Sequence, residues 1–584
     1  MGVRENSSKI IPSPSIPLPE GEGRQHAHSR AAVLPDGKGS EAPSGIAHPR
    51  IPLPRDLYLP ERLNSRAFDL SDSHVMEPLL QRLHEEAKRD WRTNPIIAGR
   101  RIARNERPVT DPSDRRRVVG HVCEAEAADV DAALEHAVAA AYEWDRAGAE
   151  VRAQCLERMA DFIEQHYEPF MALAVREAGK TIPDALAEVR EATDFCRYYG
   201  ARARSDLRVR TLRGPTGEHN ELQWHGRGVW SCISPWNFPL AIFTGQIAAA
   251  LGAGNCVIAK PAEQAPLIAA LAVELFHRAG IPAEVLQLLP GAGGTIGAQL
   301  IADPRTSGIA FTGSVETAHA INLALAKRTG PIVPLIAETG GQNTMIVDST
   351  ALPEQVVDDV IASAFRSTGQ RCSALRVLFL QDEVAERIMG LLCEAAAELA
   401  IGDPGLLATD VGPVIDDEAL QRLEAHCGRM RADARTLYTA RLPADCAHGS
   451  FFAPRIFEID GLDRVPEEVF GPILHIVRYD ADHLDRVLEA INATRFGLTL
   501  GIQTRIGAKA REIQARLRVG NAYVNRNTIG AVVGVQPFGG EGLSGTGPKA
   551  GGPNYLQRFA VERVLSINTA ASGGNTSLAN LDDC

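Results

Sequence analysis

The sequence predicts an α/β fold built around parallel sheet, divided into more than one domain. One observation predicts the fold class and a second predicts the number of domains. Between Val229 and Phe311, short apolar runs alternate with stretches of helical periodicity, a pattern typical of βαβ units. The chain has 584 residues, too many for a single hydrophobic core, so we expect two or three domains. Hydrophobic residues make up 45% of the chain and charged residues 23%, as in ordinary globular proteins, so most of it can fold.

The first predicted elements are alanine-rich helices between Val130 and Gly200. Here Leu156, Met159, Phe162 and Ile163 recur at the spacing of one helix face. These side chains therefore belong to a core and carry no chemistry.

A β-hairpin is predicted next, over residues 207–228. Its residues are rich in β-compatible types, and the segment Gly214-Pro-Thr-Gly217 supplies a turn. Four predicted parallel strands follow, at Val229–Ile233, Cys256–Ala259, Val285–Leu289 and Gly308–Phe311. Further on we expect a helix around Leu391–Ala400 and strand structure over Tyr555–Thr569.

Residues 1–60 are predicted to be a disordered leader. They contain ten of the 36 prolines, in runs such as Ile11-Pro-Ser-Pro-Ser-Ile-Pro-Leu-Pro19, which oppose helix and a packed core. Residues 576–584 read as a tail.

Charge and cysteine content exclude several classes of protein. The net charge of -12 argues against nucleic-acid binding, and the short basic run Arg115-Arg-Arg117 reads as a solvated turn. The ten cysteines contain no Cys-x-x-Cys pair, so the sequence indicates neither a metal site nor a disulfide framework, and we expect a reducing, cytoplasmic setting. Neither a signal peptide nor a membrane-spanning run is found in the sequence.

Cys372 is the candidate nucleophile. It lies in Ser367-Thr-Gly-Gln-Arg-Cys-Ser-Ala-Leu-Arg376, among small and polar residues that leave its sulfur approachable. Arg371 beside it, and a Ser-Ala-Leu run that we expect to open a helix, would lower the pKa of the thiol. The alternative is an inert buried cysteine, so the prediction depends on partners elsewhere.

Two such partners lie upstream. Glu338, in Glu338-Thr-Gly-Gly-Gln-Asn343, is a carboxylate before two glycines, as suits a general base presented into a cleft. Asn237, in Pro235-Trp-Asn-Phe-Pro239, is an amide between two prolines that fix the backbone, a mount for an oxyanion donor. Taken singly, the ordinary reading is favoured for each residue: a solvated surface glutamate for Glu338 and an asparagine in a turn for Asn237. Together they complete the set that aldehyde oxidation through a thiol requires.

These three motifs, with 135 residues from Asn237 to Cys372 and 34 from Glu338 to Cys372, closely resemble the aldehyde dehydrogenase superfamily. The resemblance covers roughly residues 60–575. It implies the aldehyde dehydrogenase fold, an NAD cofactor and a β-hairpin that pairs subunits in a homodimer or higher homo-oligomer. The implied parts are a Rossmann-like NAD-binding domain (61–206 and 229–338), an oligomerisation flap (207–228 with 553–575) and an α/β catalytic domain (339–552).

The adenosine side of the cofactor is expected at Lys260 and Glu263, which follow a predicted strand, where open α/β sheets place ligands. Glu263 would accept from the ribose hydroxyls and repel a 2′-phosphate, which favours NAD over NADP. The resemblance also implies that Gly293 lies near the cofactor, although its segment has the spacing G-x-G-x-x-x-G rather than the strict dinucleotide motif.

The rest of the cofactor site is expected downstream. Gly313 and Ser314 precede a helical stretch, so their N–H groups and the Ser314 hydroxyl would meet the phosphates, although Ala318 replaces a glycine common in the family. By resemblance, Glu468 holds the nicotinamide ribose and Phe470 packs near the ring. Ser234 and Trp236 complete the predicted contacts.

The implied reaction is oxidation of an aldehyde to a carboxylic acid. The Cys372 thiolate adds to the aldehyde, the Asn237 amide stabilises the oxyanion, and a hydride passes to NAD to leave a thioester. Glu338 then activates water to hydrolyse the thioester, which favours hydrolysis over transfer to coenzyme A.

The substrate prediction depends on the loop Gly542-Leu-Ser-Gly-Thr-Gly-Pro-Lys-Ala-Gly-Gly-Pro553. Consecutive N–H groups of Gly551 and Gly552, with the Ser373 hydroxyl, would bind one carboxylate, although such a loop is also simply flexible. The loop resembles that of the L-glutamate-γ-semialdehyde (Δ1-pyrroline-5-carboxylate) dehydrogenases, above all the dehydrogenase half of the bifunctional proline utilization A proteins. Phe238, Arg371 and Phe538 are the other predicted substrate contacts.

Two alternatives stay open. The chain would be a dehydrogenase of another semialdehyde, such as succinic semialdehyde, or a non-catalytic NAD-binding scaffold. The departure from the resembled bifunctional proteins is the lack of a proline dehydrogenase barrel before residue 60. The chain therefore resembles a free-standing or a truncated second half, and a separate proline dehydrogenase flavoprotein is a candidate source of its substrate.

Overall fold

The computed structural model describes residues 50–572. The predicted tail at 576–584 and residues 1–49 of the predicted leader lie outside these residues. A compact unit begins at Leu53. Within it Pro54–Asp56 form a 3-10 helix, and the N–H of Asn64 donates to the carbonyl oxygen of Arg55 at 2.9 Å, so the last part of the predicted leader is folded.

The first large sheet has seven strands in the order β12-β11-β8-β9-β10-β2-β3. Its five strands from β12 to β10 are parallel, and β2 and β3 join antiparallel at one edge. The four strands predicted from apolar runs are all present and parallel, so the βαβ prediction is confirmed. The seven strands of the sheet are β2 (Ile96–Ile97), β3 (Arg100–Arg101), β8 (Val229–Ile233), β9 (Cys256–Lys260), β10 (Leu286–Leu288), β11 (Thr306–Thr312) and β12 (Leu335–Glu338).

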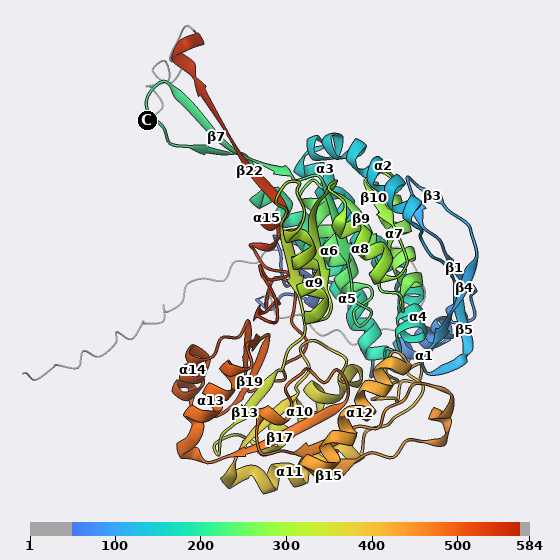
Figure 1. Ribbon diagram of the computed structural model, residues 1–584, viewed down its shortest axis with the longest axis vertical. Helices are drawn as coiled ribbons and strands as arrows, with labels where there is room; N and C mark the ends of the chain where they lie inside the picture. The colour runs from blue at the N-terminus through green and yellow to red at the C-terminus, as the bar shows by residue number, and fades with distance from the viewer. Residues whose placement is uncertain (1–49, 573–584) are drawn as a thin grey trace, which may run out of the picture. The chain divides into compact units, whose positions relative to one another are not determined.

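Helices pack against this sheet and against one another (Figure 1). Helices α2, α6 and α7 contact its strands, and α3 and α5 pack on α6 and α7. The predicted helical region between Val130 and Gly200 is confirmed as α2 to α5. The helices are α1 (Ser73–Glu86), α2 (Ala127–Arg146), α3 (Gly148–Gln165), α4 (Tyr167–Ala178), α5 (Ile182–Asp206), α6 (Ala241–Gly252), α7 (Pro266–Arg278), α8 (Ala298–Ala302) and α9 (Val315–Ala326).

The second large sheet also has seven strands, in the order β15-β16-β17-β14-β13-β19-β20, and only β15 is antiparallel. Met345 of β13 points into one hydrophobic cluster and its neighbour Ile346 into another, as expected for a sheet covered on both faces. The strands are β13 (Thr344–Val347), β14 (Val377–Gln381), β15 (Arg435–Thr439), β16 (Arg455–Glu458), β17 (Ile473–Tyr479), β19 (Thr499–Gln503) and β20 (Asn521–Val524). The helices of this region are α10 (Pro353–Phe365), α11 (Asp382–Ala397), α12 (Asp417–Asp433), α13 (Leu484–Ala493) and α14 (Gly507–Arg516).

A three-stranded sheet contains the predicted hairpin. Strands β6 (Arg210–Leu212) and β7 (Glu218–Gly226) pair antiparallel, and β22 (Ala560–Asn568) pairs along the whole of β7. Figure 1 shows β7 and β22 projecting away from the helices. The strand expected over Tyr555–Thr569 is wrong at its start, because Tyr555–Arg558 form the short helix α15, whose Tyr555 and Leu556 are buried.

The remaining strands form two small sheets. β1 (Trp91–Thr93), β5 (Asp114–Cys123) and β4 (Glu106–Asp111) make a three-stranded sheet, and β18 (Phe496–Gly497) pairs with β21 (Glu541–Gly542).

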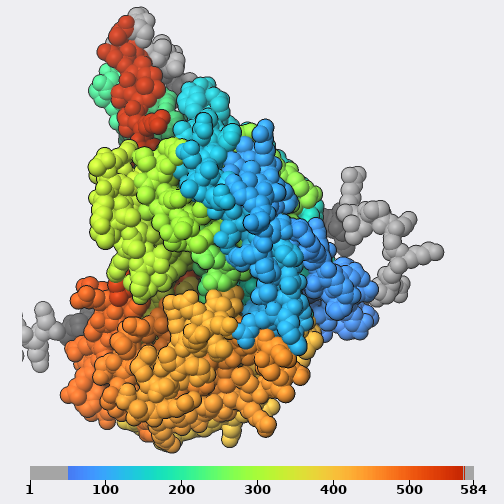
Figure 2. Space-filling view, turned by 45° about the vertical axis from the view of Figure 1, so that its right-hand side comes forward, coloured from blue at the N-terminus to red at the C-terminus, as the bar shows by residue number. Residues whose placement is uncertain are grey.

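The two large sheets are joined directly by a functional motif. β12 ends at Glu338 and β13 begins at Thr344, so the segment Glu338-Thr-Gly-Gly-Gln-Asn343 crosses from one sheet to the other. In Figure 2 the blue-to-green surface that includes the first sheet's helices borders the orange surface of the second sheet's region. Residues 53–572 lie in one compact unit, so the division into cofactor and catalytic domains stays a prediction.

Candidate functional site

Cys372 lies in a loop between the turn Arg366–Gly369 (η3) and strand β14, and its side chain is half-buried. The loop is fixed by Asn343, whose Nδ2 donates to the carbonyl oxygens of Cys372 at 2.6 Å and Ala374 at 2.9 Å. The Ser-Ala-Leu run does not open a helix. It leads into β14, so the predicted helix dipole at the thiol is wrong.

The predicted lowering of the thiol pKa is also wrong. Burial, together with the carboxylates of Glu468 and Glu338, raises the pKa of Cys372 to about 12, and Arg371 opposes this shift. Arg371 is engaged elsewhere: its guanidinium donates to Asp184 at 2.7 Å and to Ser367 Oγ at 2.9 Å. The thiol is therefore protonated at neutral pH in this arrangement.

Asn237 lies beside the same loop, as the sequence predicts. It is buried in the connection between β8 and α6, and its Nδ2 donates to the carbonyl oxygen of Gln370 at 3.1 Å. The neighbouring Phe238 ring lies 4.2 Å from Lys180 Nζ and 5.3 Å from Arg371 Cζ. Two cations thus pack on the ring that follows the amide.

Glu338 is at the last position of β12 and behaves as a buried acid. Burial raises the pKa of Glu338 to about 8, while the N–H of Gly540 and the charge of Lys549 oppose the shift. Its Oε2 accepts from Gly540 N at 3.2 Å, and its buried Oε1 has no hydrogen-bond partner within residues 50–572. A Cβ at Gly539 would come within 2.9 Å of Oε1. The carboxylate therefore has an open acceptor in a cradle that requires glycine.

Two of the three residues predicted on the adenosine side of the cofactor, Glu263 and Gly293, are hydrogen-bonded to each other. The Oε1 atom of Glu263 accepts from Gly293 N at 2.7 Å, and Lys260 Nζ donates to the carbonyl oxygen of Pro261 at 2.9 Å. Burial lowers the pKa of Lys260 to about 8. Gly293 begins a π-helical turn, Gly293–Gly297, that leads into α8.

The predicted phosphate contacts are only partly available. Ser314 caps helix α9, and its Oγ accepts from Thr317 N at 3.2 Å. The N–H of Gly313 donates to the carbonyl oxygen of Glu338 at 3.1 Å. This N–H therefore holds the backbone of Glu338, and its contact with a phosphate stays a prediction.

The predicted nicotinamide contacts come together from both sheets. The rings of Trp236 and Phe470 meet edge to face with centroids 5.7 Å apart. Glu468 Oε1 accepts from Gly341 N at 3.2 Å, and a Cβ at Gly340 would lie 1.6 Å from Glu468 Oε2. The hydroxyl of Ser234 is buried without a hydrogen-bond partner in the part of the chain that the structure describes.

The predicted carboxylate clamp is not open. The N–H of Gly551 donates to the Tyr199 hydroxyl at 2.8 Å, and the N–H of Gly552 donates to the carbonyl oxygen of Lys549 at 3.2 Å. Both N–H groups are thus used within the protein, one by helix α5 and one by the loop itself, and their contact with a carboxylate stays a prediction. Phe538 is half-buried and pairs with Ala550 through two backbone hydrogen bonds of 2.9 and 2.8 Å, while Ser373 is buried.

Sequence reasoning missed Lys180, Asp184, Arg376 and Lys549. Lys180 and Asp184 lie at the start of α5 and pair with Glu188 at 3.1 Å and Arg371 at 2.7 Å. Nothing in the Glu-Ala-Gly-Lys segment before α5 shows that Lys180 is buried, because a lysine in a connection between helices is ordinarily exposed. Nothing local could have shown that Arg376 is wholly buried.

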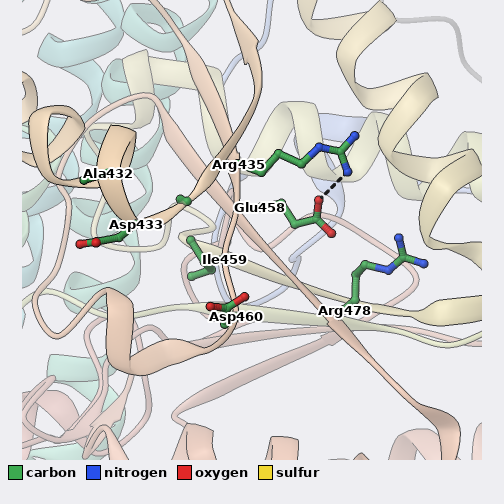
Figure 3. A pocket seen from close by; sticks show the side chains of 8 residues that line it. Ala432, Asp433, Arg435, Glu458, Ile459, Asp460 and Arg478 are labelled. Carbon is green, nitrogen blue, oxygen red and sulfur yellow. Dashed lines mark hydrogen bonds and ion pairs between the residues drawn. The ribbon is translucent and has the colours of Figure 1, made fainter.

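A separate surface cavity of about 690 Å³ lies at the end of α12 (Figure 3). Arg435 and Glu458 form an ion pair of 3.0 Å on its wall. None of the predicted site residues lines it.

Within residues 50–572, the cysteines are free, no group of three or more potential metal ligands occurs, and no helix has the length and apolarity to cross a bilayer.

Comparison with known proteins shows the family of this chain. Residues 101–564 match the aldehyde dehydrogenase family. The chain is 51% identical over 532 residues to the bifunctional protein PutA of Klebsiella aerogenes, covering 90% of this chain and 40% of that protein. It is 35% identical over 490 residues to the 1-pyrroline-5-carboxylate dehydrogenase of Geobacillus kaustophilus, covering 82% of this chain and 93% of that one.

Solved structures give the same result. A crystal structure of a bifunctional proline utilization A protein has 53% identity and a TM-score of 0.83, covering 90% of this chain and 50% of that one. A Thermus 1-pyrroline-5-carboxylate dehydrogenase with bound NAD has 33% identity and a TM-score of 0.82, covering 86% and 98%. The chain thus spans about half the length, or less, of the bifunctional proteins it matches.

Proposed function

Because this chain belongs to the aldehyde dehydrogenase family, we propose that it oxidises L-glutamate-γ-semialdehyde, the open form of Δ1-pyrroline-5-carboxylate, to L-glutamate with NAD, the second step of proline catabolism. The observation that carries the proposal is the convergence of a half-buried thiol, a buried amide and a half-buried carboxylate from three separate segments. Asn237 holds the loop of Cys372 through Gln370, and burial raises the pKa of Glu338 to about 8.

The residues present fit NAD. Glu263, with Lys260 and Gly293 beside it, would accept from the adenosine ribose, and its charge would repel a 2′-phosphate. On the nicotinamide side Glu468 lies beside Gly340, where a Cβ would collide with its carboxylate. The buried Ser234 hydroxyl has no hydrogen-bond partner within residues 50–572 and so can bond to the cofactor. When bound, NAD supplies the hydride acceptor.

The proposed catalytic roles are those of a nucleophile, an oxyanion donor and a general base. Cys372, once deprotonated, adds to the aldehyde carbon, and Asn237 Nδ2 is the donor placed to stabilise the resulting oxyanion. Loss of hydride leaves a thioester on Cys372. Glu338 then takes a proton from the attacking water, for which its unpartnered Oε1 is suited, and the acid is released.

The substrate carboxylate is assigned to the loop around Gly551 and to Ser373. Binding there would exchange the bond between Gly551 N and the Tyr199 hydroxyl for one to the carboxylate. The identity of the relatives named 1-pyrroline-5-carboxylate dehydrogenase supports this substrate class.

Assembly and setting form part of the proposal. The sheet β22-β7-β6 exposes Val564, Leu565 and Ile567, apolar side chains that suit pairing with a second copy of the chain. The free thiols suit the reducing cytoplasm. A proline dehydrogenase flavoprotein would supply the substrate, either separate from this chain or joined to it.

The test is NADH formation at neutral pH by the purified protein with L-glutamate-γ-semialdehyde, beside succinic semialdehyde and a Cys372→Ala variant. Strong turnover of the first substrate alone, abolished in the variant, is expected. Turnover of succinic semialdehyde alone would refute the substrate and keep the chemistry. Absence of turnover with intact NAD binding would instead indicate a scaffold.

A further inference from the structure

Arg376 is a wholly buried arginine four residues after Cys372. Its Nη1 donates to the carbonyl oxygens of Gly369 at 2.7 Å and Gly471 at 3.2 Å. Its Nη2 donates to the carbonyl oxygen of Arg371 at 2.9 Å and to Glu468 Oε1 at 3.4 Å. One side chain therefore contacts both the nucleophile loop and the segment that contains Glu468.

The turn before Cys372 is in a conformation that needs such support. Ser367, Thr368 and Gly369 have φ values of 51°, 57° and 63°, three successive residues in the left-handed region. This region is unfavourable for L-residues and worst for β-branched ones such as Thr368. Strained backbone persists only where surrounding contacts hold it. Arg376 holds the last of these residues through the Gly369 carbonyl.

On its other side Arg376 holds the groups proposed to bind the nicotinamide ribose. Burial raises the pKa of Glu468, and the guanidinium of Arg376 opposes that shift, so the arginine favours the charged carboxylate. The guanidinium carbon also lies 5.2 Å from the centroid of Phe470, the ring that meets Trp236. A displacement of Glu468 would therefore act directly on Arg376, the residue that holds the Cys372 loop.

The backbone of Arg376 is fixed in turn. Its N–H donates to the carbonyl oxygen of Asn343 at 3.0 Å, and its own carbonyl oxygen accepts from the backbone N–H of His475 at 3.0 Å. The guanidinium therefore extends from a rigid base, as a coupling element requires.

A buried arginine can also be a purely structural tie, and the chain offers one for comparison. Arg455 is buried, has an unpartnered Nε as Arg376 does, pairs with Glu424 at 2.9 Å, and lies 4.5 Å from the Phe452 ring. It contacts neither the Cys372 loop nor Glu468. Each arginine is buried and contacts one carboxylate and one aromatic ring, but only Arg376 connects the Cys372 loop to Glu468.

We propose that Arg376 is a positioning residue that couples the carboxylate Glu468 to the conformation of the Cys372 loop, so that binding of the nicotinamide ribose and placement of the thiol are set together. The proposal rests on the proposed function for the identity of the cofactor. A lysine cannot replace the guanidinium here, because one ammonium cannot reach four acceptors in two directions.

The test compares Arg376→Lys with Arg455→Lys in the full chain. We expect Arg376→Lys to weaken NAD binding about tenfold in a fluorescence titration, as for loss of one charge-assisted hydrogen bond. We expect it to raise KM for NAD with less than a threefold change in KM for the semialdehyde, and to change the rate of Cys372 alkylation by iodoacetamide at least threefold. We expect both lysine variants to lower the melting temperature by similar amounts. Arg455→Lys should leave the NAD affinity, both KM values and the alkylation rate unchanged.

A double-variant cycle with Glu468→Gln completes the test. If Arg376 acts through Glu468, the NAD dissociation constant of the double variant will equal that of the single variant that binds NAD more weakly. If the two residues act independently, the two fold-changes will multiply. Independent effects, or equal changes in the two lysine variants, would overturn the proposal. NAD binding and alkylation use no aldehyde, so a wild-type chain that fails to oxidise the semialdehyde would refute the proposed function and leave this test valid.

Discussion

The side-chain amide of Asn237 donates to the carbonyl oxygen of Gln370 at 3.1 Å, two residues before Cys372. The amide comes from the connection after β8 of the first sheet, and the carbonyl from the loop that enters β14 of the second. A donor from one sheet is thereby fixed beside the loop of the proposed nucleophile, Cys372, which enters the other sheet. Since such a donor is already oriented, it needs little reorganisation when charge develops on the substrate oxygen.

Replacing Asn237 should therefore affect chemistry more than binding. We expect Asn237→Ala to lower kcat by about 10²- to 10³-fold, the usual cost of removing one oxyanion donor, with little change in the NAD dissociation constant. Steady-state kinetics and an NAD titration measure both. Asn255→Ala is the control, because Asn255 is also buried and donates to Ala250 and Phe559 at 3.1 and 3.0 Å, far from Cys372 along the chain. Equal kcat losses in the two variants would contradict the assignment.

Glu338→Gln should stop the reaction after the hydride step. Glutamine preserves the shape of the side chain but cannot accept the proton of the attacking water. We expect a burst of NADH equal to the number of active sites, followed by a steady rate lowered at least 10²-fold, with the acyl group on Cys372 detected by mass spectrometry. A variant that shows neither a burst nor an acyl-enzyme would place Glu338 before the hydride step.

The same carboxylate predicts a pH dependence. Burial raises the pKa of Glu338 from 4.5 to about 8, so most molecules hold it protonated at pH 7. Thioester hydrolysis should therefore rise about tenfold per pH unit towards pH 8 and then level off. The effect on stability has the opposite sign. The folded state binds this proton more tightly than the unfolded chain, so the Glu338 contribution to stability is complete below pH 4.5 and lost as the pH rises through 8. A deacylation rate that is flat from pH 6 to 8 would exclude this base.

Cys372 should react as a buried thiol. Burial raises the pKa of Cys372 to about 12, and Glu468 and Glu338 contribute in the same direction. In the protein without NAD we expect alkylation by iodoacetamide to become about tenfold faster per pH unit from pH 7 to 9, without a plateau. A plateau below pH 8 would show a thiol already ionised.

Local patterns in the sequence predicted most of the fold, because strand runs such as Val229–Ile233 are set by burial of consecutive apolar residues. They also pointed to Asn237, Glu338 and Cys372, whose motifs are short and local and whose catalytic roles stay predictions. They failed where a distant residue decides the outcome. Gly551 N is satisfied by Tyr199, and the pKa of Cys372 is set by burial and by Glu468 and Glu338, so neither could be found from neighbouring letters.

The last prediction concerns space rather than charge. A Cβ at Gly340 would lie 1.6 Å from Glu468 Oε2, so Gly340→Ala must displace the carboxylate that we assign to the nicotinamide ribose. We expect the NAD dissociation constant to rise at least tenfold while the melting temperature changes little, measured by titration and thermal unfolding. Gly390→Ala is the control: Gly390 lies in α11 with nothing within 4 Å of a new Cβ, so this change should stabilise the fold by about 0.5–1 kcal/mol. Unchanged NAD affinity in Gly340→Ala would mean that Glu468 can leave its cradle without loss. The ribose would then be held by other groups, and the coupling assigned to Arg376 would lose its partner.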